Sequence, residues 1–304
     1  MFPFVHAGGF VVVRGVNCAV TVPMFIARLN ATTTTAPVGT LLCPSADFYR
    51  VYESRDRFAA WPWTPLGTTT NTFFDAPHLG DGLSHFYIVR AVRATTEGGN
   101  STMASKIEVD VGFIPGRTNI RWFSLPHRSE YSMASEIAGE LGPGKIDVLG
   151  KWDAATQRTL LYYYFRGRWQ GNDFLIAPGD GLFLSSVSAF PWVIVGTDRG
   201  ITHSFTFNAP PLTNFNWVGV PYTGTYDFAI DLVRDIEGGT GPGTNTKIVE
   251  VAKWDAATQT LLVYSYSGVG WIGNDFAIDP GDAVYFRIVA DFTWQPDLIT
   301  PEVP

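Results

Sequence analysis

The chain has 304 residues and a net charge of −7; 46% of its residues are hydrophobic, 14% aromatic and only 16% charged. The length exceeds that of one ordinary domain of about 100–150 residues, and the apolar content is sufficient for folded cores, which excludes a disordered chain. An acidic chain has no basic surface to neutralise phosphates, so we expect neither nucleic acid nor an anionic membrane as a partner. No uninterrupted apolar run reaches the length of about 18 residues that spans a membrane.

The first 36 residues contain short apolar runs and four consecutive threonines at 32–35. They fit neither of the units that follow them in the chain. We interpret residues 1–36 as an N-terminal arm, or as the tail of a preceding segment, whose apolar β-type stretches could add to the sheet of a neighbour.

Two cysteines and two glycosylation sequences bear on whether the protein is secreted. Cys18 and Cys43 are too few for a disulfide-rich scaffold or a four-ligand zinc site. They either form one disulfide or are two small buried apolar residues. Asn30 and Asn100 each begin an Asn-X-Thr sequence and are glycan acceptors only in a secreted protein.

Residues 37–115 have the alternation of short strands and turns that is typical of a β-sandwich. The segments YRVYES at 49–54, LGTTTNTFFD at 66–75 and FYIVRAV at 86–92 are followed by the turn-rich GGNSTMAS at 98–105. In this order they resemble the central strands of a fibronectin type III domain, over residues 38–113. The resemblance implies a spacer or adhesion module of an extracellular, multidomain protein.

The rest of the chain contains an internal repeat. The heptapeptide KWDAATQ at 151–157 recurs letter for letter at 253–259, and 21 of the 38 positions from 145 to 182 are identical at this offset of 102. Upstream the offset is 95, so the second copy has seven extra residues, which we place in the glycine-rich stretch at 238–243. We therefore divide this part into two homologous domains, 116–202 and 203–304.

Each copy has the pattern of a small α+β unit with one short helix, so the predicted fold is mainly β: a β-sandwich followed by two such domains. Ser132 and Asp227 are the expected helix N-caps. Apolar residues at i, i+4 and i+8 predict the buried helix face; they are Met133, Ile137 and Leu141 in the first copy and Phe228, Leu232 and Ile236 in the second. The repeats are also similar to uncharacterised modules of prokaryotic cell-surface and secreted proteins.

Three aspartates recur in each copy and are candidates for Ca²⁺ binding or acid–base chemistry: Asp153, Asp173 and Asp180, with Asp255, Asp275 and Asp282. Each lies beside turn residues, where a carboxylate commonly accepts hydrogen bonds from its own backbone. We favour that structural role, and predict no catalytic residue, no bound metal and no cofactor. The five histidines lack metal-ligand spacing, and nucleophile, phosphate-loop and dinucleotide motifs are absent. We therefore expect that the chain is not an enzyme.

Four tryptophans are candidates for contacts with a partner or a glycan. Trp169 and Trp271 follow a glycine-containing turn in each copy and are either core residues or sugar-stacking platforms. Trp61 and Trp63 flank a proline, which disfavours a central strand. We expect them at an edge or in a loop, where they contact a partner or pack on the neighbouring domain.

The modular order, the duplication and the missing catalytic motifs predict a non-catalytic extracellular structural protein of a cell-surface layer, a filament or other appendage, or an adhesin. We expect it to associate with copies of itself or with neighbouring domains of a larger surface protein. The alternative is a carbohydrate-binding accessory region of a secreted hydrolase, in which Trp169 and Trp271 stack on sugars.

Overall fold

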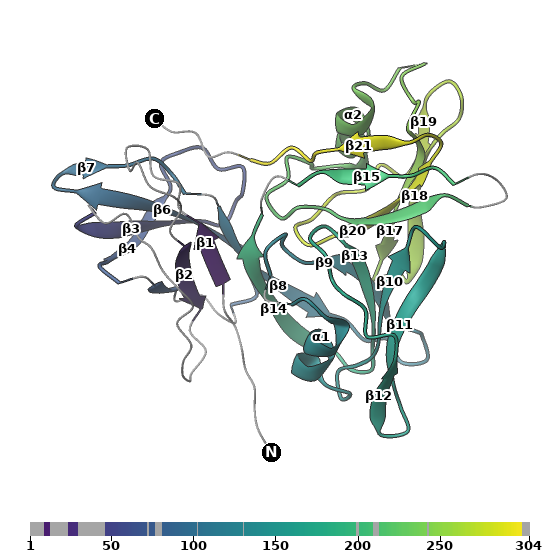
Figure 1. Cartoon of the computed structure of the whole chain (residues 1–304), viewed down its shortest axis with the longest axis horizontal. Coiled ribbons are helices and arrows are strands. Elements are labelled where there is room, and N and C mark those ends of the chain that lie inside the picture. The colour runs from purple at the N-terminus through teal and green to yellow at the C-terminus, as the bar shows by residue number, and fades with distance from the viewer. Residues whose placement is uncertain are drawn as a thin grey trace.

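The computed structural model describes residues 9–12, 24–29, 46–71, 73–76, 81–101, 103–129, 131–198, 201–208, 213–241 and 243–299. Over these residues the chain is mainly β with two short helices, as predicted. Figure 1 shows an N-terminal β module on the left, the first copy of the repeat at lower right and the second copy above it.

The N-terminal module is a β-sandwich of two sheets. The smaller sheet has the order β1 (Gly9–Val12), β2 (Met24–Leu29), β5 (Phe73–Ala76). The larger sheet has the order β14-β8-β6-β3-β4, with β7 on β6. Its strands are β3 (Phe48–Ser54), β4 (Thr64–Thr69), β6 (His85–Arg93), β7 (Thr96–Glu97), β8 (Ala104–Val111) and β14 (Phe190–Thr197).

The strands β1 and β2 correct the expectation that residues 1–36 form an arm outside the sandwich. β1 pairs with β2, and β2 pairs in parallel with β5 of the same chain. A strand tethered to an open sheet edge closes a loop at modest entropic cost, whereas adding it to a neighbour's sheet would require association of two chains. These two strands are therefore part of the sandwich, with β1 at the edge of the smaller sheet.

The central strands of the larger sheet are buried on both faces, which explains the nearly continuous apolar run of β6. On one face, Tyr49 and Val89 belong to a cluster that also contacts Phe74 of the smaller sheet. On the other face, Ile88 and Ile107 belong to a core that continues into the first copy of the repeat. The N-terminal module and the first copy therefore share one hydrophobic core.

Each copy folds into a five-stranded antiparallel sheet with the same strand order. In the first copy the order is β12-β11-β10-β13-β9, with β9 (Ile120–Ser124), β10 (Ile146–Asp153), β11 (Arg158–Phe165), β12 (Arg168–Gly171) and β13 (Gly181–Ser186). In the second copy it is β19-β18-β17-β20-β16, with β16 (Phe215–Gly219), β17 (Ile248–Asp255), β18 (Thr260–Tyr266), β19 (Trp271–Gly273) and β20 (Ala283–Ile288). The seven extra residues lie in the loop between the helix and β17, as predicted.

One helix covers the inner face of each sheet: α1 (Ala134–Leu141) and α2 (Ala229–Glu237). The predicted positions Ile137, Leu141, Leu232 and Ile236 are buried. The N-caps are Met133 and Phe228 rather than Ser132 and Asp227, because a carboxylate in the first turn, Glu136 or Asp231, accepts from both backbone amides that precede the helix. As an N-cap residue, Phe228 is 48% exposed and not part of the buried face.

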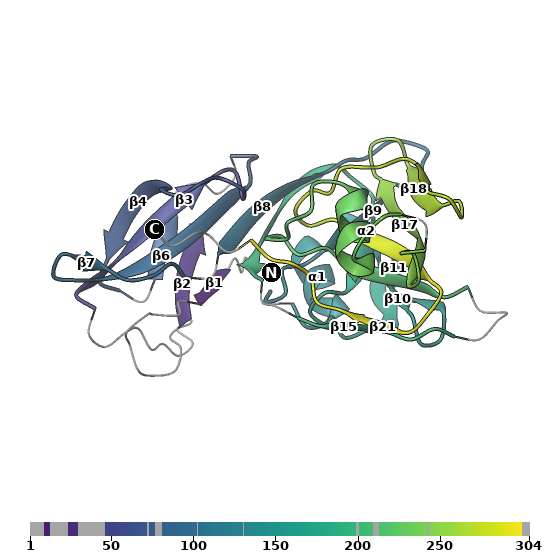
Figure 2. The same ribbon diagram turned by 90° about the horizontal axis from the view of Figure 1, so that it is seen from above.

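A pair of strands beside each sheet extends the repeat further upstream than residue 116. β14 pairs with β8, and in the second copy β21 (Phe292–Trp294) pairs with β15 (His203–Phe205). Trp192 and Trp294 are equivalent and lie opposite Val109 and His203. β8 is thus a strand of the first copy as well as of the N-terminal sheet, and Figure 2 shows it running from one part into the other.

Arg57 fastens the N-terminal module to the second copy. Its guanidinium donates to the carbonyl oxygens of Tyr226 (2.6 Å), Tyr222 (3.3 Å) and Ile278 (3.3 Å). The residue is only 6% exposed, and burial lowers the pKa of the guanidinium. Three carbonyl acceptors compensate the lost hydration of this buried cation, so the contact fixes the two parts relative to each other.

A buried charge cluster lies inside the N-terminal module. The ring nitrogens of the fully buried His85 lie 2.6 Å from Glu53 Oε1 and 2.7 Å from Asp81 Oδ2. The fully buried Lys106 donates from Nζ to Asp81 and Glu108, each at 2.8 Å. Burial raises the pKa of Asp81, but hydrogen bonds from Lys106 and His85 outweigh burial and hold this pKa well below its usual range. The buried charges of the cluster thus compensate one another.

We expect Lys106→Met to lower the free energy of unfolding by about 3–5 kcal/mol, because Asp81 and Glu108 lose their shared counter-charge. Urea denaturation followed by tryptophan fluorescence measures this change. Arg93→Met, an exposed position in the same module, is the control and should change stability by about 0.5 kcal/mol or less. Equal effects of the two substitutions would contradict the role of the cluster.

Candidate functional site

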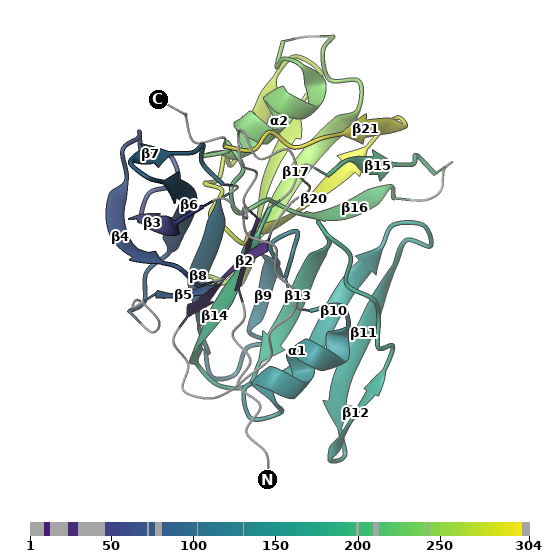
Figure 3. The same ribbon diagram turned by 60° about the vertical axis from the view of Figure 1, so that its left-hand side comes forward.

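The two copies pack against each other through the sheet faces that their helices leave open, one copy above the other in Figure 3. The rings of Trp122 and Trp217, at equivalent positions, lie 4.3 Å apart between centroids. Trp254 lies 6.3 Å from Trp122, and Trp152 lies 6.5 Å from Trp217. Because each contact has a counterpart made by the equivalent residues, the copies are related by an approximate two-fold axis.

Two glutamines of the repeated heptapeptide make the same contact in both directions. Gln157 in the first copy accepts from the Phe215 amide (2.8 Å) and donates to its carbonyl (2.9 Å). Gln259 in the second copy accepts from the Ile120 amide (2.7 Å) and donates to its carbonyl (3.0 Å). Each glutamine thus satisfies both backbone groups of one residue on the outer strand of the other copy, β16 or β9.

Backbone contacts complete this interface with the same reciprocity. The Gly219 amide donates to the Gly179 carbonyl (2.8 Å), and the equivalent Ser124 amide donates to the Gly281 carbonyl (2.7 Å). A Cβ atom at Gly219 would lie 2.5 Å from Ser124 Cβ, so only glycine allows this approach. The interface assigns a structural role to the Trp and Gln of the heptapeptide.

The repeated aspartates each accept hydrogen bonds with a structural role. Asp153 accepts from the Ala155 amide (3.1 Å) and the Thr156 hydroxyl (2.6 Å), and these hydrogen bonds lower the pKa of its carboxyl. Asp173 accepts from the Ser135 amide in the first turn of α1 (2.8 Å). Their counterparts Asp255 and Asp275 make the equivalent bonds in the second copy.

Asp180 and Asp282 each form an ion pair with the lysine of the heptapeptide, Lys151 or Lys253. Each also accepts from a backbone amide of its own turn at 2.7 Å. Within the described residues, no three or more His, Cys, Asp or Glu side chains are placed to hold one metal ion. The turn role that we favoured therefore describes Asp153, Asp180 and their counterparts, whereas Asp173 and Asp275 accept from the first turn of a helix instead.

The candidate tryptophans differ in their exposure to solvent. Trp63 is 5% exposed and donates to the Ala59 carbonyl (2.9 Å). It therefore lies in the core, and the prediction that it contacts a partner is wrong. Trp61 is half-buried beneath the Arg90 guanidinium, 3.9 Å from the ring centroid. Trp169 and Trp271 are half-buried on the helix side of their sheets, each 5.4 Å from a tyrosine ring.

The structure describes one of the candidate glycosylation and disulfide sites. Asn100 is half-buried, and its side-chain oxygen accepts from Arg90 Nε (2.6 Å). Cys18, Cys43 and Asn30 lie outside the described residues. The disulfide and both glycosylation sites therefore stay predictions.

Two histidines that the sequence leaves far apart meet where the copies join. The rings of His127 and His203 lie 6.4 Å apart, and His203 stacks on Trp294 at 5.4 Å. Burial, together with the nearby His127, lowers the pKa of His203 to about 4. No spacing in the sequence signals this pair, because the contact depends on how the second copy folds back onto the first.

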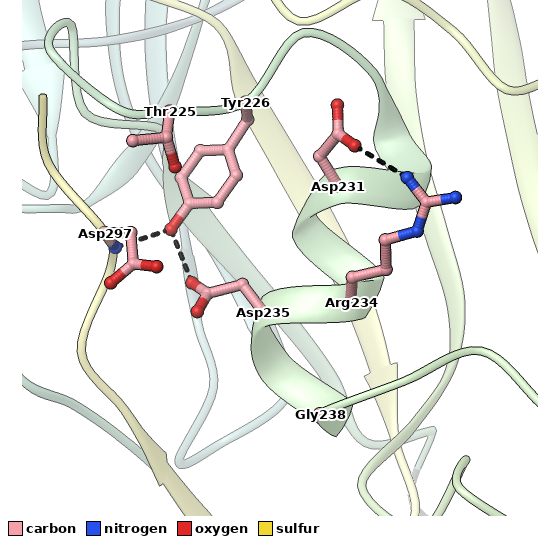
Figure 4. Close-up of a pocket in the computed structure, with 7 residues that line it drawn as sticks. All are labelled: Thr225, Tyr226, Asp231, Arg234, Asp235, Gly238 and Asp297. Carbon is pink, nitrogen blue, oxygen red and sulfur yellow. Dashed lines mark hydrogen bonds and ion pairs between the residues drawn. The ribbon is translucent and has the colours of Figure 1, made fainter.

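A shallow acidic depression beside α2 is the one hollow that we consider as a binding site (Figure 4). It has a volume of about 530 Å³ and is lined by Asp231, Arg234, Asp235 and Asp297 among others. Asp235 accepts from the Tyr226 hydroxyl and from Trp294 Nε1, each at 2.6 Å, whereas the Asp297 side chain is exposed. The depression is shallow and open to solvent.

The charge of the chain is concentrated in the second copy. Residues 203–304 contain four Lys or Arg and 12 Asp or Glu, whereas residues 116–202 contain nine and eight. The interface and the core face of the hairpins are nearly the same in both copies, so the difference lies in the outward-facing residues. The two copies therefore share one fold but differ in the charge of their outward-facing surfaces.

No family model, curated protein or solved structure matches this chain. Neither helix of the described residues is long and apolar enough to cross a membrane.

We expect Gln157→Ala to lower the free energy of unfolding by about 1–3 kcal/mol, because the Phe215 amide and carbonyl lose their partners inside an interface. Chemical denaturation measures the change. Gln170→Ala in β12 is the matched control, since its amide makes a single long hydrogen bond at 3.3 Å, and it should change stability by about 0.5 kcal/mol or less.

The lowered pKa of His203 predicts a loss of stability in acid. The folded state holds the neutral ring, while the unfolded chain takes up a proton below about pH 6.5, so stability falls as the pH drops from about 6.5 to about 4. His203→Phe keeps the stack on Trp294 and removes this titration. Between about pH 7 and pH 4, the wild type should lose about 2–3 kcal/mol more than the variant; parallel losses would contradict the assignment.

Proposed function

We propose that this chain is a non-catalytic, self-associating structural module of an extracellular assembly, such as a surface layer, a filament or an adhesin. One observation carries the proposal: the repeated aspartates and the glutamines of the heptapeptide have structural partners. The aspartates cap helices and close turns, and the glutamines bind the other copy. The repeated carboxylates, which were the candidates for acid–base chemistry, are thus engaged in structural contacts.

The connections among the three parts support a structural role. The N-terminal module shares a core and the strand β8 with the first copy, and Arg57 binds carbonyls of the second copy. The second copy binds the first through the two-fold interface. Each part is therefore held by both of the others, which suits a building block better than a set of modules on flexible linkers.

The extracellular location is part of the proposal and depends on the N-terminal module. Its larger sheet has the order β8-β6-β3-β4 and faces the sheet β1-β2-β5 across a shared cluster, which supports a fibronectin III-like sandwich. Such modules serve as spacers in extracellular proteins, and the glycosylation sequence at Asn100 is consistent with secretion.

We expect the purified full-length chain to form oligomers or filaments whose size grows with concentration. Light scattering coupled to size-exclusion chromatography, together with negative-stain microscopy, tests this expectation. A chain that stays monomeric at the highest attainable concentration would contradict self-association. Saturable glycan binding that Trp271→Ala abolishes would instead favour the carbohydrate-binding alternative.

A further inference from the structure

The outward face of the β11–β12 hairpin in the first copy is both apolar and basic. Leu161, Tyr163 and Phe165 alternate along β11 and are 39%, 38% and 52% exposed. Three exposed arginines surround them: Arg158, Arg166 and Arg168. We call these six residues the basic strip. Over the described part of the chain, none of its arginines takes part in an ion pair.

The second copy shows that the hairpin folds without this strip. The inward-facing residues are identical in the two hairpins: Leu160, Tyr162, Tyr164 and Trp169 correspond to Leu262, Tyr264, Tyr266 and Trp271. The outward-facing residues differ, since Tyr163 and Phe165 correspond to Ser265 and Ser267, and the arginines to Thr260, Gly268 and Gly270. Both hairpins pair in the same way. The basic strip is therefore not needed for folding, which leaves a surface role.

The complementary surface on this chain is the acidic depression beside α2. Asp231, Asp235 and Asp297 line it together with Arg234, which pairs with Asp231 at 3.1 Å. The Asp297 side chain is exposed, and the side chain of Phe228 at the start of α2 is 48% exposed. The second copy has 12 acidic and only four basic residues, so its field attracts a cationic surface. Arginine suits such a site because its planar guanidinium can donate to two carboxylate oxygens at once.

The two surfaces cannot meet within one molecule. Figures 1 and 3 show the β11–β12 hairpin at the lower end of the molecule and α2 at the upper end. A contact between them must join two chains, and it leaves one basic strip and one acidic depression free at the ends of each pair. Such a heterologous contact repeats until a ring closes or a filament grows.

We propose that the basic strip of one chain docks onto the acidic depression of a second copy of this chain, so that the molecules associate head to tail. This inference rests on the proposed function and names the surfaces that carry it out. The apolar side chains of the strip would be buried in the contact and the arginines would face the carboxylates, so the association should weaken as salt screens the charges.

The test compares two charge reversals of equal size by sedimentation velocity on the full-length chain. We expect Arg166→Glu with Arg168→Glu to weaken association at least about tenfold. Arg55→Glu with Arg93→Glu, which changes two exposed arginines of the N-terminal module, is the control and should associate as the wild type does. Adding Asp297→Lys to the first variant should restore association, because the reversed charges again attract each other.

A second variant tests whether weaker association could come from misfolding of the hairpin. It exchanges the strip residues for those of the second copy, with Tyr163→Ser, Phe165→Ser, Arg166→Gly and Arg168→Gly, and should fold with an unchanged circular dichroism spectrum but associate weakly. If the wild type assembles and all these variants assemble equally well, the assigned surfaces are wrong while the proposed function stands. If the wild type itself stays monomeric, both proposals are wrong.

Discussion

The structure depends on the packing of two homologous sheets through the faces that their helices leave open. Trp122 and Trp217 pack against each other at the centre, and Gln157 and Gln259 bind the outer strand of the opposite copy. A five-stranded sheet with one short helix buries only one of its faces, so an isolated copy would expose aromatic residues to water. Two copies in one chain bury these faces against each other without the entropic cost of bringing two molecules together.

The N-terminal module is built into this arrangement rather than appended to it. β8 is a strand of the sandwich and also the partner of β14, and the central strands of the sheet that they form are buried on both faces. Arg57 also binds carbonyl oxygens of the second copy. The domain boundary that the sequence suggests near residue 115 thus comes just after β8, a strand that belongs to both the N-terminal module and the first copy.

The duplication separates what folding requires from what the surface does. Residues that face the helices or the other copy are largely the same in the two copies, since each must fit an equivalent environment. Outward residues are free of that constraint, and they have diverged into a basic, aromatic hairpin and an acidic helix face. The contrast between the copies directs attention to Phe165 and Arg168, which no single motif would single out.

The sequence by itself determined the mainly β class, the repeat, the two helices and the loop that holds the extra residues, because periodicity and turn chemistry act over neighbouring positions. It also indicated structural roles for Asp153 and Asp255, whose partners lie within three residues. It could not place Trp63 in the core, join His127 to His203, or assign β1 and β2 to the sandwich. Only the tertiary structure decided these, because burial and pairing between distant segments depend on how the sheets pack.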